Sequence, residues 1–133
     1  MKKIEVVAAI ITHDDKILCM QRGASEYSYL EYKYEFPGGK IEPGESRTCA
    51  LARELKEEMD IDAVIEEKDF FMTVEHQYPD FEILMHSFLV KAKKKDFVRK
   101  EHYNHKWLSQ KDLLTLDWAQ ADIPIAKKLM ERN

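Results

Sequence analysis

Apolar residues follow two different periodicities along the chain, and each periodicity predicts a different kind of element. Residues 4–12 are rich in β-branched side chains, and the pair Asp14-Asp15 separates them from a second apolar run at residues 17–20. Two β-branched or apolar runs joined by a short polar turn are typical of a β-hairpin. The pattern therefore predicts a hairpin over residues 4–20.

The clearest helical periodicity covers residues 46–59. Pro43-Gly44-Glu45 precedes this stretch, and no Gly or Pro interrupts it. Leu51, Leu55 and Met59 recur at every fourth position, which places them on one face of a helix. We therefore expect an amphipathic helix that packs this face against the rest of the fold.

The other apolar runs predict that this helix lies among strands. Residues 70–76 and 83–91 have the residue types of strands, and the segment Tyr78-Pro79-Asp80 between them is a turn signal. The further expected elements are a tyrosine-rich loop at 27–34 that leads into a short strand at 35–39, a last strand at 107–108, and a closing helix at 124–130 with Ile125 and Leu129 inward.

Residues 91–100 form the densest basic segment of the chain, with six of its 21 Lys and Arg residues. Phe97 and Val98 interrupt the basic residues, so the segment also has apolar positions. We interpret it as a solvated hairpin whose lysines protect a sheet edge, and a phosphate-binding patch is the alternative.

Composition narrows the class of protein. The 133-residue chain contains 44% hydrophobic and 35% charged residues, which is typical of a folded globular protein. Its length fits a single domain over residues 1–133. The formal net charge of −4 argues against polymeric nucleic acid as the main partner, because phosphate binding usually requires an excess of basic residues.

The lack of a recognisable targeting signal and the small number of cysteines both favour a reducing compartment. The apolar run at residues 6–11 follows two lysines but is short and has no small-residue cleavage site, and no stretch is long enough to span a bilayer. We therefore expect a cytoplasmic protein with no membrane partner. Cys19 and Cys49 are too few for a disulfide framework and lie in apolar stretches, so we interpret both as reduced core residues.

Three acidic residues of the expected helix form the first candidate for chemistry. Glu54, Glu57 and Glu58 are three and four positions apart, so their carboxylates share one stripe of the helix. Like charges at this spacing repel one another, which favours a divalent cation that neutralises them. Oxygen ligands suit Mg²⁺ or Mn²⁺, either of which could bridge phosphate oxygens. A solvated acidic face is the alternative.

Residues close to this stripe favour the metal site. Gly38-Gly39 precedes the helix by a short loop, and its backbone can approach a metal and phosphate cluster without a side chain in the way. Arg53 lies beside the acidic stripe, where its guanidinium could orient carboxylates through paired hydrogen bonds.

The segment from Gly39 to Ile61 resembles the Nudix box, G-x5-E-x7-R-E-U-x-E-E-x-G-U, in which U is aliphatic. Its fixed positions are met by Gly39, Glu45, Arg53-Glu54-Leu55, Glu57-Glu58 and Ile61. Asp60 replaces the last glycine, which is expected to end the helix in a left-handed conformation, and Asp tolerates that conformation better than most residues. The resemblance implies an α/β fold, a Nudix-type α/β/α sandwich with a mixed β-sheet.

The similarity extends along nearly the whole chain to the MutT-like branch of the family, and in particular to bacterial CTP pyrophosphohydrolases. It is carried by residues 1–11, 35–39, 101–107 and 121–124. The resemblance implies that Glu54 is a metal ligand or the general base, with Glu101 as the second candidate for the base. The implied metal ligands are the Gly38 carbonyl, Glu57, Glu58 and Glu101, and the implied phosphate-binding residues are Arg22 and Lys40. A surface charge or a solvated loop acid is the alternative for Arg22, Lys40 and Glu101.

Candidates for base recognition also follow from the resemblance. Tyr78 occupies the place of an aromatic residue that packs beside the base, and Phe36 is a candidate for the opposing wall. Asp122 aligns with a residue that reads the base edge, which is asparagine in the MutT that prefers oxidised guanine. An ionised carboxylate accepts hydrogen bonds, and cytosine presents an amine donor. Core packing is the alternative for both aromatics, and a helix cap is the alternative for Asp122.

The resemblance implies a Mg²⁺-dependent hydrolase, with Mn²⁺ as a substitute, that cleaves a nucleoside triphosphate to the monophosphate and pyrophosphate. CTP, dCTP or a modified cytosine nucleotide is the expected substrate. The alternatives are an 8-oxo-dGTP type of sanitising hydrolase and a non-catalytic nucleotide sensor, although the retained acidic residues argue against the sensor. The expected assembly is a monomer or a homodimer.

Overall fold

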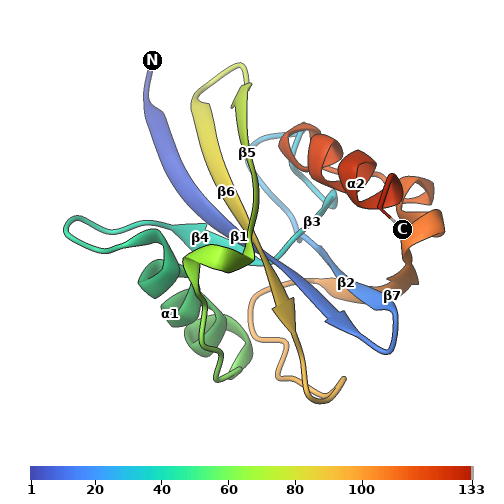
Figure 1. The fold of residues 1–133 in the computed structure, drawn as a ribbon. Helices are drawn as coiled ribbons and strands as arrows, with labels where there is room; N and C mark the ends of the chain where they lie inside the picture. Colours follow the sequence, from blue (N-terminus) through green and yellow to red (C-terminus); the bar gives the residue numbers. More distant parts are fainter. Residues whose placement is uncertain (133) are drawn as a thin grey trace.

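The computed structural model describes residues 1–132, and it places a mixed sheet between helices (Figure 1). The helices are α1 (Arg47–Met59) and α2 (Ile123–Met130), and there are three short 3₁₀ segments in the described residues, η1 (Glu67–Asp69), η2 (Gln110–Thr115) and η3 (Gln120–Asp122). No helix in this part of the chain is long and apolar enough to cross a membrane. The strands are β1 (Lys3–His13), β2 (Lys16–Gln21), β3 (Tyr34–Glu35), β4 (Gly38–Lys40), β5 (Phe70–Gln77), β6 (Glu82–Lys91) and β7 (Asn104–Ser109).

Strand β1 organises the sheet because it pairs with three other strands. It runs parallel to β6 along nearly its whole length, antiparallel to β4 at Val6–Ala8, and antiparallel to β2 at the hairpin. The remaining pairs, β2 with β3, β2 with β7, and β5 with β6, are all antiparallel. The predicted hairpin and the predicted pair of strands on either side of Tyr78-Pro79-Asp80 are confirmed.

Alternate residues of β1 enter two separate cores. Val7, Ala9 and Ile11 pack with α1, whereas Ala8 and Ile10 pack on the other face with α2. This alternation follows from the geometry of a strand, in which successive side chains point to opposite faces. Both helices therefore cover the sheet from opposite sides (Figure 1), and the predicted α/β sandwich with a mixed sheet is confirmed.

Helix α1 has the ends that its sequence predicts. The Ser46 hydroxyl accepts a hydrogen bond from the Cys49 amide at 3.2 Å, which caps the N-terminus. Asp60 ends the helix in the left-handed region, with φ 55° and ψ 36°, and its amide donates to the carbonyls of Leu55 and Lys56. A non-glycine residue therefore takes the conformation expected of the missing glycine.

Two predictions about the fold are wrong. Residues 92–103 form an irregular loop and not a hairpin, because Phe97 packs into the core on the α1 side and the Val98 amide donates to the Met59 carbonyl. Cys49 is exposed, because the buried face of α1 is formed by its neighbours Ala50 and Leu51. Cys19 is buried as expected, and burial raises the pKa of its thiol to about 12.

Candidate active site

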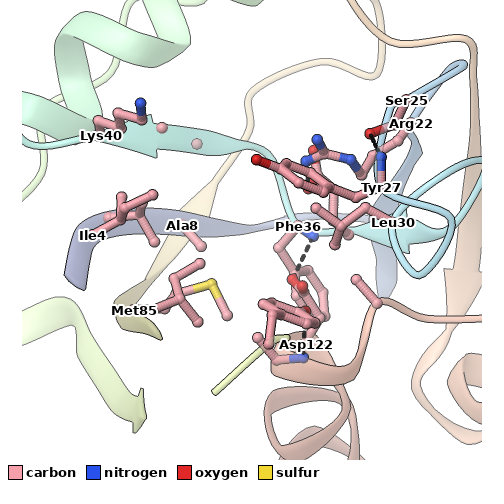
Figure 2. Close-up of a pocket in the computed structure, with 18 of the residues that line it drawn as sticks. Ile4, Ala8, Arg22, Ser25, Tyr27, Leu30, Phe36, Lys40, Met85 and Asp122 are labelled. Carbon is pink, nitrogen blue, oxygen red and sulfur yellow. Dashed lines mark hydrogen bonds and ion pairs between the residues drawn. The ribbon is translucent and has the colours of Figure 1, made fainter. Parts of the chain in front are cut away.

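A cleft of about 1110 Å³ collects most of the predicted site residues. Figure 2 shows Arg22, Tyr27 and Leu30 gathered on one side of this cleft and Lys40 away from them on β4. The site has two parts. The acidic region consists of Glu54, Glu58 and Glu101, and the aromatic region consists of Phe36, Tyr78 and Asp122.

The acidic region brings together three carboxylates from α1 and from the loop that follows β6. Glu58 lies at its centre, and its Oε2 atom is buried without a hydrogen-bond donor among residues 1–132. Burial and the nearby carboxylates of Glu54 and Glu101 raise the pKa of Glu58 to about 9. The crowding of Glu58 with two other carboxylates is unfavourable unless a positive charge compensates it.

The two glycines of β4 allow this crowding by letting three segments approach closely. A Cβ atom at Gly39 would overlap the carboxylate of Glu54, and one at Gly38 would overlap the Val7 carbonyl oxygen of β1. Any side chain at Gly39 would therefore displace Glu54 from its position below β4. This packing requirement explains Gly38-Gly39 without invoking their backbone flexibility.

Arg53 orients the carboxylates around the acidic region. Its Nε and Nη2 atoms donate to the two carboxylate oxygens of Glu45 at 2.7 and 3.0 Å. Nη2 also donates to the Lys40 carbonyl at 3.0 Å, and Nη1 donates to Glu54 and Glu57 at 3.0 and 3.1 Å. The bonds from Arg53 lower the pKa of Glu45 to about 2. Glu57 is thus held by Arg53 on the solvent side, with 58% of its side chain exposed.

The donor set of the acidic region fits a divalent cation. Within the described residues, no three Asp, Glu, His or Cys side chains form a complete metal cage. Mg²⁺ typically takes one or two carboxylates and completes its shell with phosphate oxygens and water, so a complete protein cage is not required. The buried Glu58 oxygen without a donor, together with the adjacent carboxylates, supplies the hard oxygen ligands that Mg²⁺ or Mn²⁺ prefers.

The two basic residues predicted to face phosphates differ in their surroundings. Arg22 donates from Nη1 to Glu35 at 2.9 Å, and its buried Nε atom has no acceptor among residues 1–132. Lys40 is exposed at the end of β4. Both line the cleft, which is compatible with an anionic ligand.

Sequence reasoning missed a pair of residues that lies between the two regions. Glu35 accepts hydrogen bonds from Arg22 and from Nε2 of His102, each at 2.9 Å. Burial alone would raise the pKa of Glu35, but the bonds from His102 and Arg22 lower it overall. Both residues belong to motifs noted in the sequence, yet 67 positions separate them. Their contact therefore depends on the fold and could not be read from local spacing.

In the aromatic region, Phe36 and Tyr78 are both core residues and lining residues. Phe36 stacks on Trp118 with ring centroids 4.7 Å apart, and Tyr78 stacks on Tyr29 at 5.1 Å. The Tyr78 hydroxyl also accepts a hydrogen bond from the Ala121 amide at 2.9 Å. Core packing, the alternative for both aromatics, is therefore confirmed, and both residues also line the cleft. Their contact with a base stays a prediction.

Of the two sequence interpretations of Asp122, the helix cap is wrong and base recognition stays a prediction. Its side chain does not cap α2, and its Oδ1 atom instead accepts a hydrogen bond from the Phe36 amide at 3.0 Å (Figure 2). Burial and the negative charge of Glu35 raise the pKa of Asp122 well above its ordinary value. The neutral form offers a donor as well as an acceptor, so the raised pKa widens the pH range in which Asp122 can do both.

Known proteins resemble this chain along its length. The model of the NUDIX domain family matches residues 1–129. The CTP pyrophosphohydrolase of Escherichia coli strain K12 is 40% identical over 131 residues, which covers 98% of this chain and 93% of that protein. The 8-oxo-dGTP diphosphatase of the same strain is 33% identical over 129 residues, covering 97% and 98%.

A solved structure agrees with these matches. The solution structure of MutT, a Nudix family hydrolase from methicillin-resistant Staphylococcus aureus 252, has a TM-score of 0.76 and 42% identity and covers 98% of each chain. The family match, the curated relatives and the structural likeness all extend over nearly the whole chain. The chain therefore belongs to the NUDIX domain family and is a Nudix hydrolase, an enzyme that acts on acid anhydrides.

Proposed function

We propose that the protein is a Mg²⁺-dependent nucleoside triphosphate pyrophosphohydrolase that acts on CTP, dCTP or a modified cytosine nucleotide. One observation carries this proposal: acidic residues, the basic residues Arg22 and Lys40, and packed aromatics beside the buried Asp122 all line the same cleft. The acidic and basic residues suit a metal-bound triphosphate, and the aromatics with Asp122 suit a base. The products would be the monophosphate and pyrophosphate.

The acidic region would hold the cation. Nudix hydrolases generally use divalent metal ions. When bound, such an ion neutralises charge on the phosphates and lowers the pKa of a coordinated water. The proposed ligands are the carboxylates of Glu54, Glu57, Glu58 and Glu101 and the Gly38 carbonyl.

The protein's own groups would then position the phosphates and accept a proton. Arg22 has an unpaired Nε atom at the cleft, so it can add a hydrogen bond to a phosphate oxygen without leaving Glu35. Lys40 would supply a second positive charge. Glu54 is the first candidate for general base, because Arg53 fixes its carboxylate at 3.0 Å, and Glu101 is the second.

Base recognition would use the aromatic region. Phe36 and Tyr78 form preformed walls, and the amine of cytosine could donate to the carboxyl group of Asp122, whose Oδ1 is already bonded to Phe36. The 40% identity to a CTP pyrophosphohydrolase supports cytosine as the base.

One observation favours a second candidate, an 8-oxo-dGTP diphosphatase. The raised pKa of Asp122 favours a neutral carboxyl group, which has one donor and one acceptor, as an asparagine side chain does. A side chain with one donor and one acceptor can form two hydrogen bonds with a purine edge that presents an acceptor and a donor. A relative that is 33% identical bears this activity in its name.

A substrate panel separates these candidates. CTP, dCTP, UTP, dGTP and 8-oxo-dGTP would be compared at equal Mg²⁺ concentration, and the products would be identified after reaction in ¹⁸O-labelled water. We expect pyrophosphate and the monophosphate, with the highest kcat/KM for a cytosine nucleotide. Preference for 8-oxo-dGTP would select the second candidate. Orthophosphate as the first product would reject the proposed cleavage, and nucleotide binding without turnover would indicate a sensor.

A further inference from the structure

Glu101 reaches the acidic region from an irregular loop whose backbone is weakly anchored. The Val98 amide donates to the Met59 carbonyl at 3.1 Å, and the Tyr103 amide donates to the Gln21 carbonyl at 2.9 Å. Within the part of the chain that the structure describes, no backbone hydrogen bond fixes residues 99–102 between these two anchors. The backbone alone therefore does not explain why Glu101 stays near Glu58.

The side chain of His102 supplies an anchor at the neighbouring position. Only 8% of this side chain is exposed, and its Nε2 atom lies 2.9 Å from the Glu35 carboxylate. Glu35 is itself fixed, because β3 pairs with β2 through Met20 and because Arg22 holds the other carboxylate oxygen at 2.9 Å. His102 thus connects the loop to a rigid part of the sheet.

Such an anchor is needed because Glu101 faces a group of the same charge. The carboxylates of Glu58 and Glu101 are close enough to hydrogen-bond if one is protonated, and Glu54 adds a further negative charge. When all three carboxylates are ionised, as metal ligands must be, their repulsion would push Glu101, which lies on the irregular loop, out towards solvent. The bond between His102 and Glu35 opposes this movement without contributing a ligand.

We propose that Glu35 and His102 form a positioning pair that holds Glu101 against Glu58 and so completes the divalent-metal site. This inference rests on the proposed metal-dependent function and assigns to the pair a role distinct from the ligands. Partners that orient metal ligands typically affect metal affinity or activity by about 10- to 100-fold. The pair acts through Glu101 and not by direct contact with the phosphates.

Four variants isolate the contact. His102→Ala removes the donor, and Glu35→Gln leaves one acceptor oxygen to face the two donors, His102 and Arg22. His102→Gln keeps an N–H donor at similar reach and should restore the bond. Lys33→Gln is the matched control, because it removes the ion pair with Asp117 at 2.7 Å, two residues from Glu35 and outside the cleft.

The readout is binding of Mn²⁺ to the nucleotide-free protein, measured by the electron paramagnetic resonance signal of free Mn²⁺. His102→Ala and Glu35→Gln should each weaken Mn²⁺ binding by about 10-fold or more, and each should raise the Mg²⁺ concentration at half-maximal activity by a similar factor. The double variant should be no weaker than the weaker single variant, because both changes break one contact. His102→Gln and Lys33→Gln should bind Mn²⁺ as the parent does.

Parental Mn²⁺ affinity in a folded His102→Ala variant would overturn the proposal. Additive losses in the double variant would also overturn it, as would a raised KM with unchanged Mn²⁺ affinity, which would mean that Glu35 acts on phosphates through Arg22. Circular dichroism checks the folding of each variant, and Glu35→Gln, which conserves volume, carries the test if His102→Ala unfolds. If the parent does not hydrolyse nucleotides, the Mn²⁺ affinities of the variants still test the positioning pair. If the parent does not bind Mn²⁺, the proposed function itself is contradicted.

Discussion

The acidic and aromatic regions of the cleft satisfy their polar groups in different ways. In the aromatic region, the Tyr78 hydroxyl and Oδ1 of Asp122 each accept a hydrogen bond from a backbone amide. In the acidic region, Glu58 has a buried oxygen without a donor and is crowded by two other carboxylates. Backbone amides satisfy the polar groups of one region, whereas the other lacks donors, which is what the proposed cation site would need.

This difference indicates how the two regions would contribute to function. A wall whose groups are already bonded and packed is rigid, so it can select a base by shape and by the hydrogen-bonding capacity that remains free. A cluster of unsatisfied carboxylates is unfavourable in the empty protein, and such stored instability is common where a protein binds a charged ligand. Substitutions that remove a carboxylate from the acidic region should therefore lower activity and raise stability. Substitutions in the aromatic region should change base selectivity.

The largest expected effect comes from Glu58→Gln. Loss of a charged ligand should lower Mg²⁺-dependent kcat by about 100-fold or more, as for other preorganised electrostatic groups. Near neutral pH the same change should raise the unfolding free energy of the metal-free protein by about 1 kcal/mol or more, because Glu58 must take up a proton to avoid charge repulsion and an amide need not. Turnover assays and thermal unfolding in EDTA measure the two effects. Glu75→Gln, an exposed acid on β5, is the control, and normal turnover in Glu58→Gln would reject the ligand assignment.

The next largest effect on activity is expected at Gly39, and Gly44 provides the matched control. Gly39→Ala places a methyl group on the Glu54 carboxylate, so kcat/KM should fall by about 10- to 100-fold. Gly44 has φ 79°, and a Cβ atom added there would meet no atom of another segment within 4 Å, so Gly44→Ala should lower the unfolding free energy by about 1 kcal/mol with kcat/KM unchanged. Equal activity losses in both variants would show that loop strain, and not the position of Glu54, controls the reaction.

Local sequence patterns predicted most of the strands and both helices, and the family motif predicted the left-handed end of α1, because each depends on residues that are close together in the chain. The left-handed Asp60 and the buried stripe of Leu51, Leu55 and Met59 are of this kind. The single strand expected at residues 35–39 is instead two strands, β3 and β4. The failures concern contacts between distant segments. The basic segment is a loop and not a hairpin because Phe97 packs into the core. The contact between Glu35 and His102 depends on where that loop lies relative to the sheet.

Asp122 shows a different limit. Its position in the cleft followed from the family resemblance, but its protonation depends on burial and on Glu35, which is distant in sequence. A residue type alone therefore did not determine whether the group accepts, donates or does both.

The ratio of kcat/KM for CTP to that for UTP tests this protonation within the aromatic region. A neutral Asp122 can donate to the carbonyl of uracil, whereas an ionised Asp122 leaves two acceptors facing each other. Raising the pH through the pKa of Asp122 should therefore increase the ratio, up to about 10-fold for one mismatched hydrogen bond. Common effects of pH on catalysis cancel in the ratio. Asp122→Ala should give a small ratio that does not change with pH, and a wild-type ratio that stays flat would remove Asp122 from base recognition.

The smallest effect is a difference in stability that is read without any substrate. Between the pKa of an unfolded Asp, about 3.9, and the raised pKa of Asp122 in the folded protein, the folded state keeps a proton that the unfolded state has lost. Wild-type stability should therefore fall with rising pH relative to Asp122→Asn, by up to about 1.4 kcal/mol per pH unit. Glu35 strengthens this trend and Arg22 weakens it, because they raise and lower the pKa of Asp122 respectively. Thermal or urea unfolding in EDTA from pH 5 to 8 measures the difference, and Asp15→Asn, in an exposed turn, should show no such slope. A constant difference between wild type and Asp122→Asn would mean that Asp122 is ionised in the folded protein, and the acceptor-based preference for cytosine would then apply at every pH in that range.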